Sequence, residues 1–196
     1  MSTVAPARRA AFEVVRRVFE DGAWADRSLR AAAAALDERD RALAQRLAYG
    51  TVQRVRTLDH AIEALARRPL AKLDPPVLAA LRLGAYQLGY LQGVPRYAAV
   101  NESVELARAA GVRRAVPFVN AVLRRLAEGL DALLAALPES TAEEAALRHS
   151  YPDWVARTWW RDLGPESAPA LMRAQNEPPE LAVRVVTYST NQPVAG

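Results

Sequence analysis

The stretch LDPPVLAALRLGAYQLGYLQ, residues 73–92, decides the fold. Asp74 is a suitable N-cap residue and Pro75 fits the first helical position, so a helix is expected to start here. Apolar side chains then cover nearly the whole circumference, and only Arg82 and Gln87 interrupt them. A helix with this pattern is buried on several sides, so we predict that it forms the centre of an all-α domain.

Two glycines inside this helix, Gly84 and Gly89, are expected to let neighbouring helices approach closely. They do not form a phosphate-binding loop, because no Lys–Ser/Thr pair follows them and they lie inside a helix. A third glycine, Gly50, interrupts the helical pattern before this segment. We expect Gly50 either to bend that helix or to admit a neighbour.

Helical patterns flank the central segment on both sides. Asp37 is the expected N-cap of a long third helix, and Gly111 is expected to stop the helix that follows the central one. The flanking helices are predicted over residues 6–21, 27–36, 38–65, 97–110 and 114–127. Residues 1–137 are therefore predicted to form one bundle of six or seven helices.

The character of the sequence changes after Pro138. Thr141 and Glu144 form a capping-box pair for a short helix. Two further helical pieces are expected over residues 151–164 and 165–179.

LAVRVVTYS, residues 181–189, is the only strong strand pattern in the chain. A single strand exposes unpaired backbone groups, so we expect a sheet that continues in sequence beyond residue 196. A tail that is disordered or that pairs with another molecule is the alternative.

Composition excludes several classes of site. The sequence contains no cysteine, which excludes disulfides, zinc–thiolate sites and a thiol nucleophile from this chain. Its two histidines, His60 and His149, are far apart, so we expect no metal site and no nucleophile–base pair. No glycine-rich loop follows a strand, so no cofactor pocket is predicted. No apolar run reaches the length of a membrane span and no signal peptide is recognisable, so a cytoplasmic protein without membrane contact is expected.

The net charge of +4 is unevenly distributed. Up to Leu130 the sequence has 21 basic and 13 acidic residues, whereas from Asp131 onward it has 5 basic and 9 acidic residues. A basic front part is typical of proteins that bind a polyanion such as nucleic acid, although solvated helix faces are charged in other proteins too. Arginine binds phosphate through a bidentate fork, and eight arginines are predicted to contact RNA: Arg8, Arg9, Arg54, Arg56, Arg113, Arg114, Arg124 and Arg125.

Three stretches together resemble the NusB-like RNA-binding domain, in the expected order and spacing. They are LAYGTVQRVRTLDHAI (residues 47–62), LRLGAYQLGYLQGVPRYAAVNESVELAR (residues 81–108) and FVNAVLRRL (residues 118–126). The resemblance covers about residues 5–137 and implies a helical, RNA-binding bundle. Such a domain occurs alone in the transcription antitermination factor NusB. It also forms the N-terminal part of the RsmB (Sun/Fmu) family of 16S rRNA cytosine-C5 methyltransferases.

Residues 138–196 resemble the linker and first strand that lead into the methyltransferase part of the RsmB family. The family shows Arg-Val-Asn in that strand, whereas here Val186 follows Arg184 and Val185. The resemblance implies that the S-adenosylmethionine-binding domain, and the two cysteines that attack and release the cytosine ring, lie beyond Gly196. This chain alone is therefore expected to be inactive, with no catalytic residue and no cofactor of its own. Its expected partner is RNA, in particular 16S rRNA.

Asn120 and Arg124 lie four residues apart at the edge of the apolar stripe of FVNAVLRRL. In the resemblance they belong to a recurring Asn-x-x-x-Arg element. We expect the Asn120 amide to hold a neighbouring helix or loop, with direct RNA contact as the alternative. For Arg124, a phosphate contact and a surface role both remain open.

Three functions remain open at this point. The first is an rRNA-recognition portion of a methyltransferase, which the segment after residue 137 favours. The second is a stand-alone NusB-type antitermination factor that acts with a ribosomal-protein partner. The third is a helical protein-interaction module, whose affinity would depend on an exposed apolar patch rather than on arginines.

Overall fold

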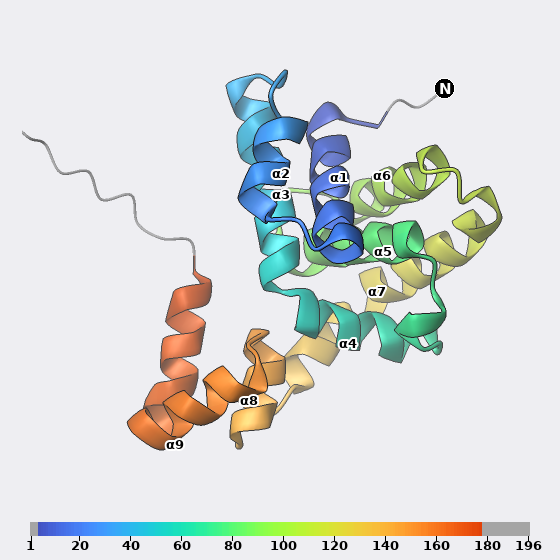
Figure 1. Ribbon diagram of the computed structural model, residues 1–196. Coiled ribbons are helices and arrows are strands. Elements are labelled where there is room, and N and C mark those ends of the chain that lie inside the picture. Colours follow the sequence, from blue (N-terminus) through green and yellow to red (C-terminus); the bar gives the residue numbers. More distant parts are fainter. Residues whose placement is uncertain (1–3, 178–196) are drawn as a thin grey trace, which may run out of the picture.

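The computed structural model of the chain describes residues 4–177, and every regular element in that range is a helix (Figure 1). This confirms the predicted all-α class, whereas the strand predicted over residues 181–189 lies outside the described residues. The longer helices are α1 (Pro6–Asp21), α2 (Ala25–Ala32), α3 (Glu38–Gln53), α4 (Val55–Ala66), α5 (Pro75–Tyr90), α6 (Arg96–Ala109), α7 (Val116–Ala136), α8 (Ala142–His149) and α9 (Asp153–Asn176). Two 3₁₀ helices, η1 (Leu70–Lys72) and η2 (Arg113–Ala115), precede α5 and α7.

Helix α5 is the centre of the bundle formed by α1–α7, as predicted (Figure 1). Helices α1, α3, α4, α6 and α7 all pack against it, and ten of its 16 residues are buried. Asp74 precedes the helix but makes no side-chain cap hydrogen bond. Pro75 and Pro76 have no N–H to offer, and the Val77 N–H donates to the Asp74 carbonyl instead.

The three interior glycines are sites of close approach, as expected. A Cβ on Gly84 would lie 2.5 Å from Leu123 Cδ2, and one on Gly89 would lie 3.0 Å from Leu130 Cδ2. A Cβ on Gly50 would lie only 2.1 Å from the Tyr86 ring. Gly50 therefore belongs to the packing of α3 on α5.

The long helix predicted to follow Asp37 is two helices, and the break lies at Arg54 rather than at Gly50. The Asp37 carboxylate caps α3 by accepting a hydrogen bond from the Asp40 N–H at 2.7 Å, as predicted. The backbone of Arg54 has φ −96° and ψ 8°, which ends α3 and starts α4. The helix passes through Gly50 without interruption because that glycine serves the Tyr86 contact. No glycine or proline stands at Arg54, so no local signal marked the break.

Two predicted helices have different boundaries in the structure. Helix α2 ends at Ala32 rather than at Leu36, and α7 starts at Val116 and continues to Ala136 rather than stopping at Ala127. Arg113 and Arg114 consequently lie in η2, before α7.

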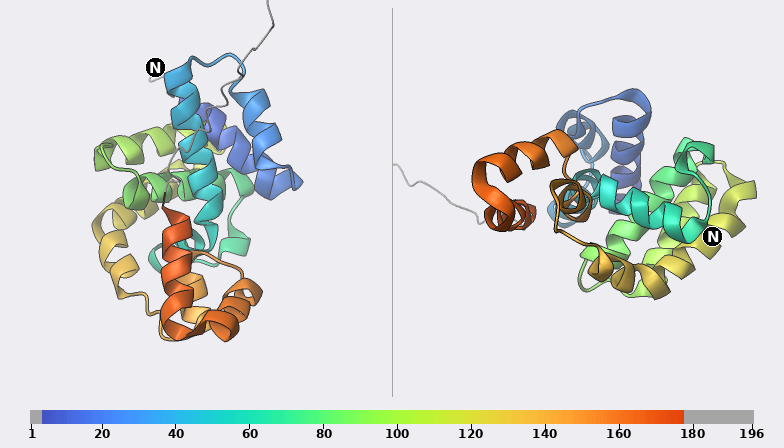
Figure 2. Two further views of the ribbon diagram at one scale, coloured as in Figure 1. Left: turned by 90° about the vertical axis from the view of Figure 1, so that its left-hand side faces the viewer. Right: turned by 90° about the horizontal axis from the view of Figure 1, so that it is seen from below.

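Helices α8 and α9 pack on each other around a small apolar cluster of their own. The capping box at Thr141 and Glu144 is formed, with the Glu144 N–H donating to Thr141 Oγ1 at 3.2 Å and the Thr141 N–H to Glu144 Oε2 at 3.1 Å. Gly164 has φ 80° and ψ 173°, so α9 is two helical pieces joined at a kink, as predicted for the two stretches that meet there. The second piece turns back toward the bundle (Figures 1 and 2).

Candidate functional site

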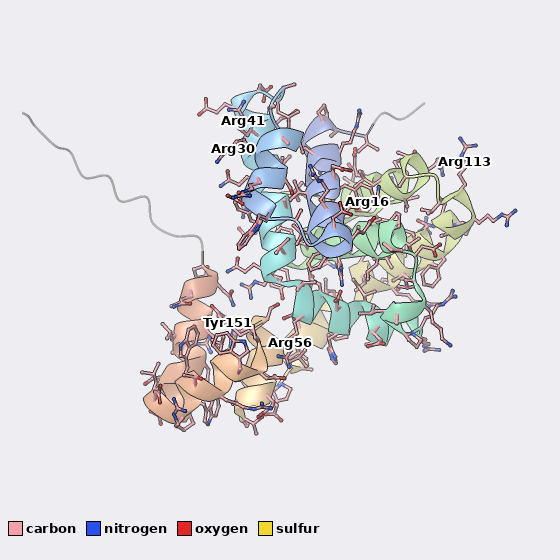
Figure 3. The ribbon with its side chains drawn as sticks, in the orientation of Figure 1. Arg16, Arg30, Arg41, Arg56, Arg113 and Tyr151 are labelled. Carbon is pink, nitrogen blue, oxygen red and sulfur yellow. The ribbon has the colours of Figure 1, made fainter. Side chains whose placement is uncertain are left out.

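The eight predicted RNA-contacting arginines do not lie on one surface. Arg113 and Arg56, for example, lie far apart, with Arg113 at the edge of the bundle and Arg56 near α8 (Figure 3). They fall into three groups. Arg113 and Arg114 lie near other cations, and Arg54 and Arg56 lie where the bundle meets α8 and α9. The other four lie along α1 and α7.

Arg113 and Arg114 line a cleft of about 650 Å³ between η1, η2 and the starts of α5 and α7. We call it the basic cleft. Its charged residues are Arg68, Lys72, Arg113 and Arg114, against the single acid Asp74, and the ring of Phe118 lines it as well. None of these four cations has an ion pair or side-chain hydrogen bond within residues 4–177, so all four charges are available to an anion.

Local chain turns bring these residues together. Arg67, in the left-handed conformation with φ 52°, ends α4 and redirects the chain at Arg68. Gly111, with φ 84°, makes the turn that places η2 opposite. The Arg68 guanidinium lies 5.8 Å from the Phe118 ring centroid, which orients it at the edge of the cleft.

Sequence reasoning missed Arg68, Lys72 and Phe118 as members of this site. The Arg67–Arg68 doublet and the only lysine of the chain were visible signals. These residues lie close to η2, which follows more than forty residues later in the sequence. That proximity depends on how α4 and α7 pack, and no local sequence pattern indicates it.

Arg54 and Arg56 connect the bundle to α8 and α9. The Arg56 guanidinium donates to the Tyr151 carbonyl at 2.8 Å and pairs with the Asp153 carboxylate at 2.7 Å, while its backbone N–H donates to Ser150 Oγ. Next to it, the buried Thr57 hydroxyl donates to the Leu147 carbonyl at 2.6 Å. The side chain of Arg56 is therefore committed to holding α8 and α9 rather than to an external ligand.

Arg54 lies against the Tyr90 ring, with its guanidinium carbon 4.7 Å from the ring centroid. It also donates a long hydrogen bond of 3.5 Å to the Asn176 carbonyl. Unlike Arg56, it forms no ion pair within the described part of the chain, and it lines an open groove.

The remaining four arginines are spread along α1 and α7. Arg8 donates to the Oε1 atom of the buried Gln87 at 2.8 Å, so it satisfies a polar group of the core. Arg9 and Arg125 donate to the Val4 and Leu65 carbonyls, each at 3.3 Å. Arg124 is exposed on α7 without such a contact among residues 4–177.

Asn120 does not show the structural role expected of it. Its side chain is half-buried on α7 and makes no hydrogen bond to a neighbouring helix or loop in the described range.

Residues 4–177 lack both a metal-binding cluster and a membrane-spanning helix. No group of three or more His, Asp or Glu side chains is placed to hold a metal ion. No helix of this range has the length and apolarity needed to cross a bilayer.

A histidine–carboxylate pair links α8 to the loop before it. His149 Nε2 lies 2.8 Å from Glu139 Oε2, and Arg173 donates to the other carboxylate oxygen at 3.0 Å. Burial lowers the pKa of His149 below 6.5 and outweighs the carboxylate that opposes it. Burial alone would raise the pKa of Glu139, but the His149 hydrogen bond and the charges of Arg148 and Arg173 bring it below 4.5.

Both depressed pKa values make the folded state less stable in acid. A group with a lowered folded pKa stabilises the fold above its unfolded value and loses that stability as the pH falls. We expect thermal unfolding followed by tryptophan fluorescence to show α8 and α9 weakening below about pH 6.5, the ordinary His value, and again below about 4.5. His149→Gln keeps a donor toward Glu139 and should remove the first decline only. Stability that rises between pH 6.5 and 5 would contradict this assignment.

Comparison with known proteins supplies the last observations on the site. Residues 5–128 match the NusB family. A probable ribosomal RNA small subunit methyltransferase B from Synechocystis is 33% identical over 190 residues, which cover 95% of this chain and 42% of that relative. The transcription antitermination protein NusB from Marinomonas is 39% identical over 93 residues, covering 47% of this chain and 53% of that protein. The NusB structure from T. maritima superposes with a TM-score of 0.57 at 24% identity, covering 65% of this chain and 93% of that one.

Proposed function

The chain belongs to the NusB family, and from that membership we propose that it binds RNA as the N-terminal recognition portion of a 16S rRNA cytosine-C5 methyltransferase. One observation carries the choice within the family. The likeness to the methyltransferase B relative extends over 95% of the chain, including α8 and α9, whereas the likeness to the Marinomonas antitermination protein covers 47%. The chain spans about two-fifths of the length of that methyltransferase relative. We therefore propose RNA recognition, and not methyl transfer, as the function of this chain.

The chemistry of the chain supports this division of labour. A cysteine-free sequence cannot form the covalent cytosine adduct that the methyltransferase reaction requires. S-adenosylmethionine and the attacking thiol are accordingly assigned to sequence that this chain does not contain. A cytoplasmic location and 16S rRNA as the target belong to the same proposal.

The basic cleft is the proposed contact with the RNA backbone. Four cations against one carboxylate give it a strongly positive field, and unpaired guanidinium groups bind phosphate oxygens in a bidentate manner. Phe118 at its edge offers an apolar face beside the cations, a combination common in sites for single-stranded nucleic acid.

Salt dependence of RNA binding tests the cleft. We expect the double variant Arg113→Ala/Arg114→Ala to bind a short single-stranded 16S rRNA fragment roughly tenfold more weakly, because two exposed charge pairs are lost. The slope of log affinity against log salt should become shallower by about 1.4, since each lost phosphate contact removes about 0.7. Fluorescence anisotropy at four or five salt concentrations measures both quantities.

A matched control removes the same charge elsewhere. Arg16 on α1 pairs with Glu20 at 2.6 Å, and Arg108 on α6 pairs with Glu105 at 3.2 Å, and neither arginine lines the basic cleft. Arg16→Ala/Arg108→Ala should leave the salt slope unchanged. An equal loss in both double variants would mean that net charge alone, and not the cleft, drives binding.

A stand-alone antitermination factor is the second candidate, because the chain is 39% identical over 93 residues to the Marinomonas NusB and its family match covers residues 5–128, within the bundle. Photo-crosslinking of bound RNA followed by mass spectrometry separates the two. Crosslinks that reach α8 and α9 support the methyltransferase portion, whereas crosslinks confined to α1–α7 support the antitermination factor.

A further inference from the structure

A second hollow of about 940 Å³ lies between α3, α5 and the end of α9. We call it the junction groove, because the end of α9, which turns back toward the bundle (Figure 2), supplies part of its lining. Its volume lies near the upper end of the roughly 300–1,000 Å³ typical of small-molecule sites. It is separate from the basic cleft and shares no lining residue with it.

Three flat side chains, those of Tyr86, Tyr90 and Arg54, lie one after another along the groove, and we call this series the ladder. The rings of Tyr86 and Tyr90 are stacked, with centroids 5.8 Å apart and planes 19° from parallel. Arg54 continues the ladder, since its guanidinium carbon lies 4.7 Å from the Tyr90 centroid. Gly50 makes room for the first ring, because any Cβ there would collide with Tyr86. Arg54, which also lines the groove, therefore adds a third flat group beside the two stacked rings.

The rim of the groove is rich in amides and poor in net charge. Gln45 and Gln92 are exposed and make no side-chain hydrogen bond within residues 4–177. The charged lining residues are Arg46 and Arg54 against Glu177, which is too little positive charge to hold a polyphosphate. Amides pair with the donors and acceptors on base edges, and guanidinium planes stack on bases.

We propose that the junction groove binds one unpaired nucleobase of an RNA strand, stacked on Arg54 and hydrogen-bonded by the rim amides. This inference rests on the proposed function, because RNA is the ligand in both. It concerns a different site, and the binding there depends on a different interaction. The basic cleft holds phosphates through charge, whereas the groove holds a base through stacking. Arg54, one of the arginines expected to contact RNA, thus contacts a base rather than a phosphate.

The test removes the planar guanidinium group of Arg54 but keeps the positive charge at that position. In Arg54→Lys, the ammonium group retains the positive charge but offers no flat surface for stacking. The probe is a single-stranded rRNA fragment that carries one 2-aminopurine, placed in turn at each unpaired position. With the unchanged protein, one position should be quenched by stacking. With Arg54→Lys, that quenching should be lost and affinity should fall about tenfold, with an unchanged salt slope.

The control makes the same substitution at Arg17, which is exposed on α1 and has no side-chain partner in the described range. Arg17→Lys should bind and quench like the unchanged protein. If Arg54→Lys fails to fold, as judged by its circular dichroism and melting temperature, Tyr49→Leu replaces it. Tyr49 is a half-buried groove residue outside the ladder, and its loss should weaken quenching at the same RNA position.

The outcomes separate the two proposals. If the unchanged protein binds no RNA at any salt concentration, the proposed function fails and the groove proposal with it. If it binds RNA but Arg54→Lys quenches and binds equally well, only the groove proposal is overturned. If free 2-aminopurine ribonucleotide binds as tightly as the RNA fragment, the groove is a mononucleotide site and the assignment to an RNA strand is wrong.

Discussion

Replacing Gly50 with alanine is expected to lower the free energy of unfolding by about 2–3 kcal/mol, as overpacked cores do. The added Cβ would lie 2.1 Å from Cζ and Oη of Tyr86. That ring cannot swing away, because it is 8% exposed and Tyr90 is stacked on it. The substitution therefore forces α3 away from α5, and guanidinium denaturation followed by circular dichroism measures the cost.

Gly129 provides the matched comparison for the same substitution. It lies inside α7, and a Cβ there would be 3.7 Å from Leu65 Cδ2, which is an ordinary contact. Gly129→Ala should be neutral or stabilise the fold by up to about 1 kcal/mol, because alanine favours the helix. Similar effects of the two substitutions would show that helix propensity, not the Tyr86 contact, decides the role of Gly50.

Replacing Met172 with alanine is expected to cost about 2–4 kcal/mol and to open α8 and α9 while leaving the bundle folded. Met172 is fully buried and is the only large side chain among the buried residues of this cluster, the others being alanines. Its removal leaves a cavity that alanines cannot close. Amide hydrogen exchange read by mass spectrometry should show faster exchange in α8 and α9, with α5 and α7 unchanged.

The same helix offers a control at Leu163, which is 46% exposed. Leu163→Ala should change stability by no more than about 0.5 kcal/mol. The comparison also tests the division that we propose between residues 1–137 and 138–196. Simultaneous loss of protection in both parts of Met172→Ala would mean that they unfold as one unit, against that division.

Local signals predicted much of the fold. The buried circumference of α5, the Asp37 cap, the Thr141–Glu144 capping box and the Gly164 kink each depend on neighbours within a few residues. Short stretches of sequence are enough to predict such features, and the structure confirmed them. The break at Arg54 escaped prediction because no residue there disfavours a helix.

The candidate sites were less predictable for a physical reason. Whether an arginine is free or engaged depends on partners that are distant in sequence, such as Gln87 for Arg8 and Asp153 for Arg56. The basic cleft likewise needs Arg68 and Arg113 to meet across helix packing. Residue type and local spacing could identify candidates, but only tertiary structure could group them.

The end of α9 has a consequence for whatever is joined to it. The Asn176 side chain accepts a hydrogen bond from Gln53 at 3.0 Å and donates one to the His149 carbonyl at 2.8 Å. Helix α9 is therefore anchored at its far end, beside the junction groove, instead of swinging about the Gly164 kink. A group tethered to a fixed anchor explores a smaller volume than one on a swinging arm, which raises its effective concentration near the bundle. Breaking the two Asn176 hydrogen bonds would lower that effective concentration while leaving the basic cleft intact, because Asn176 does not line that cleft.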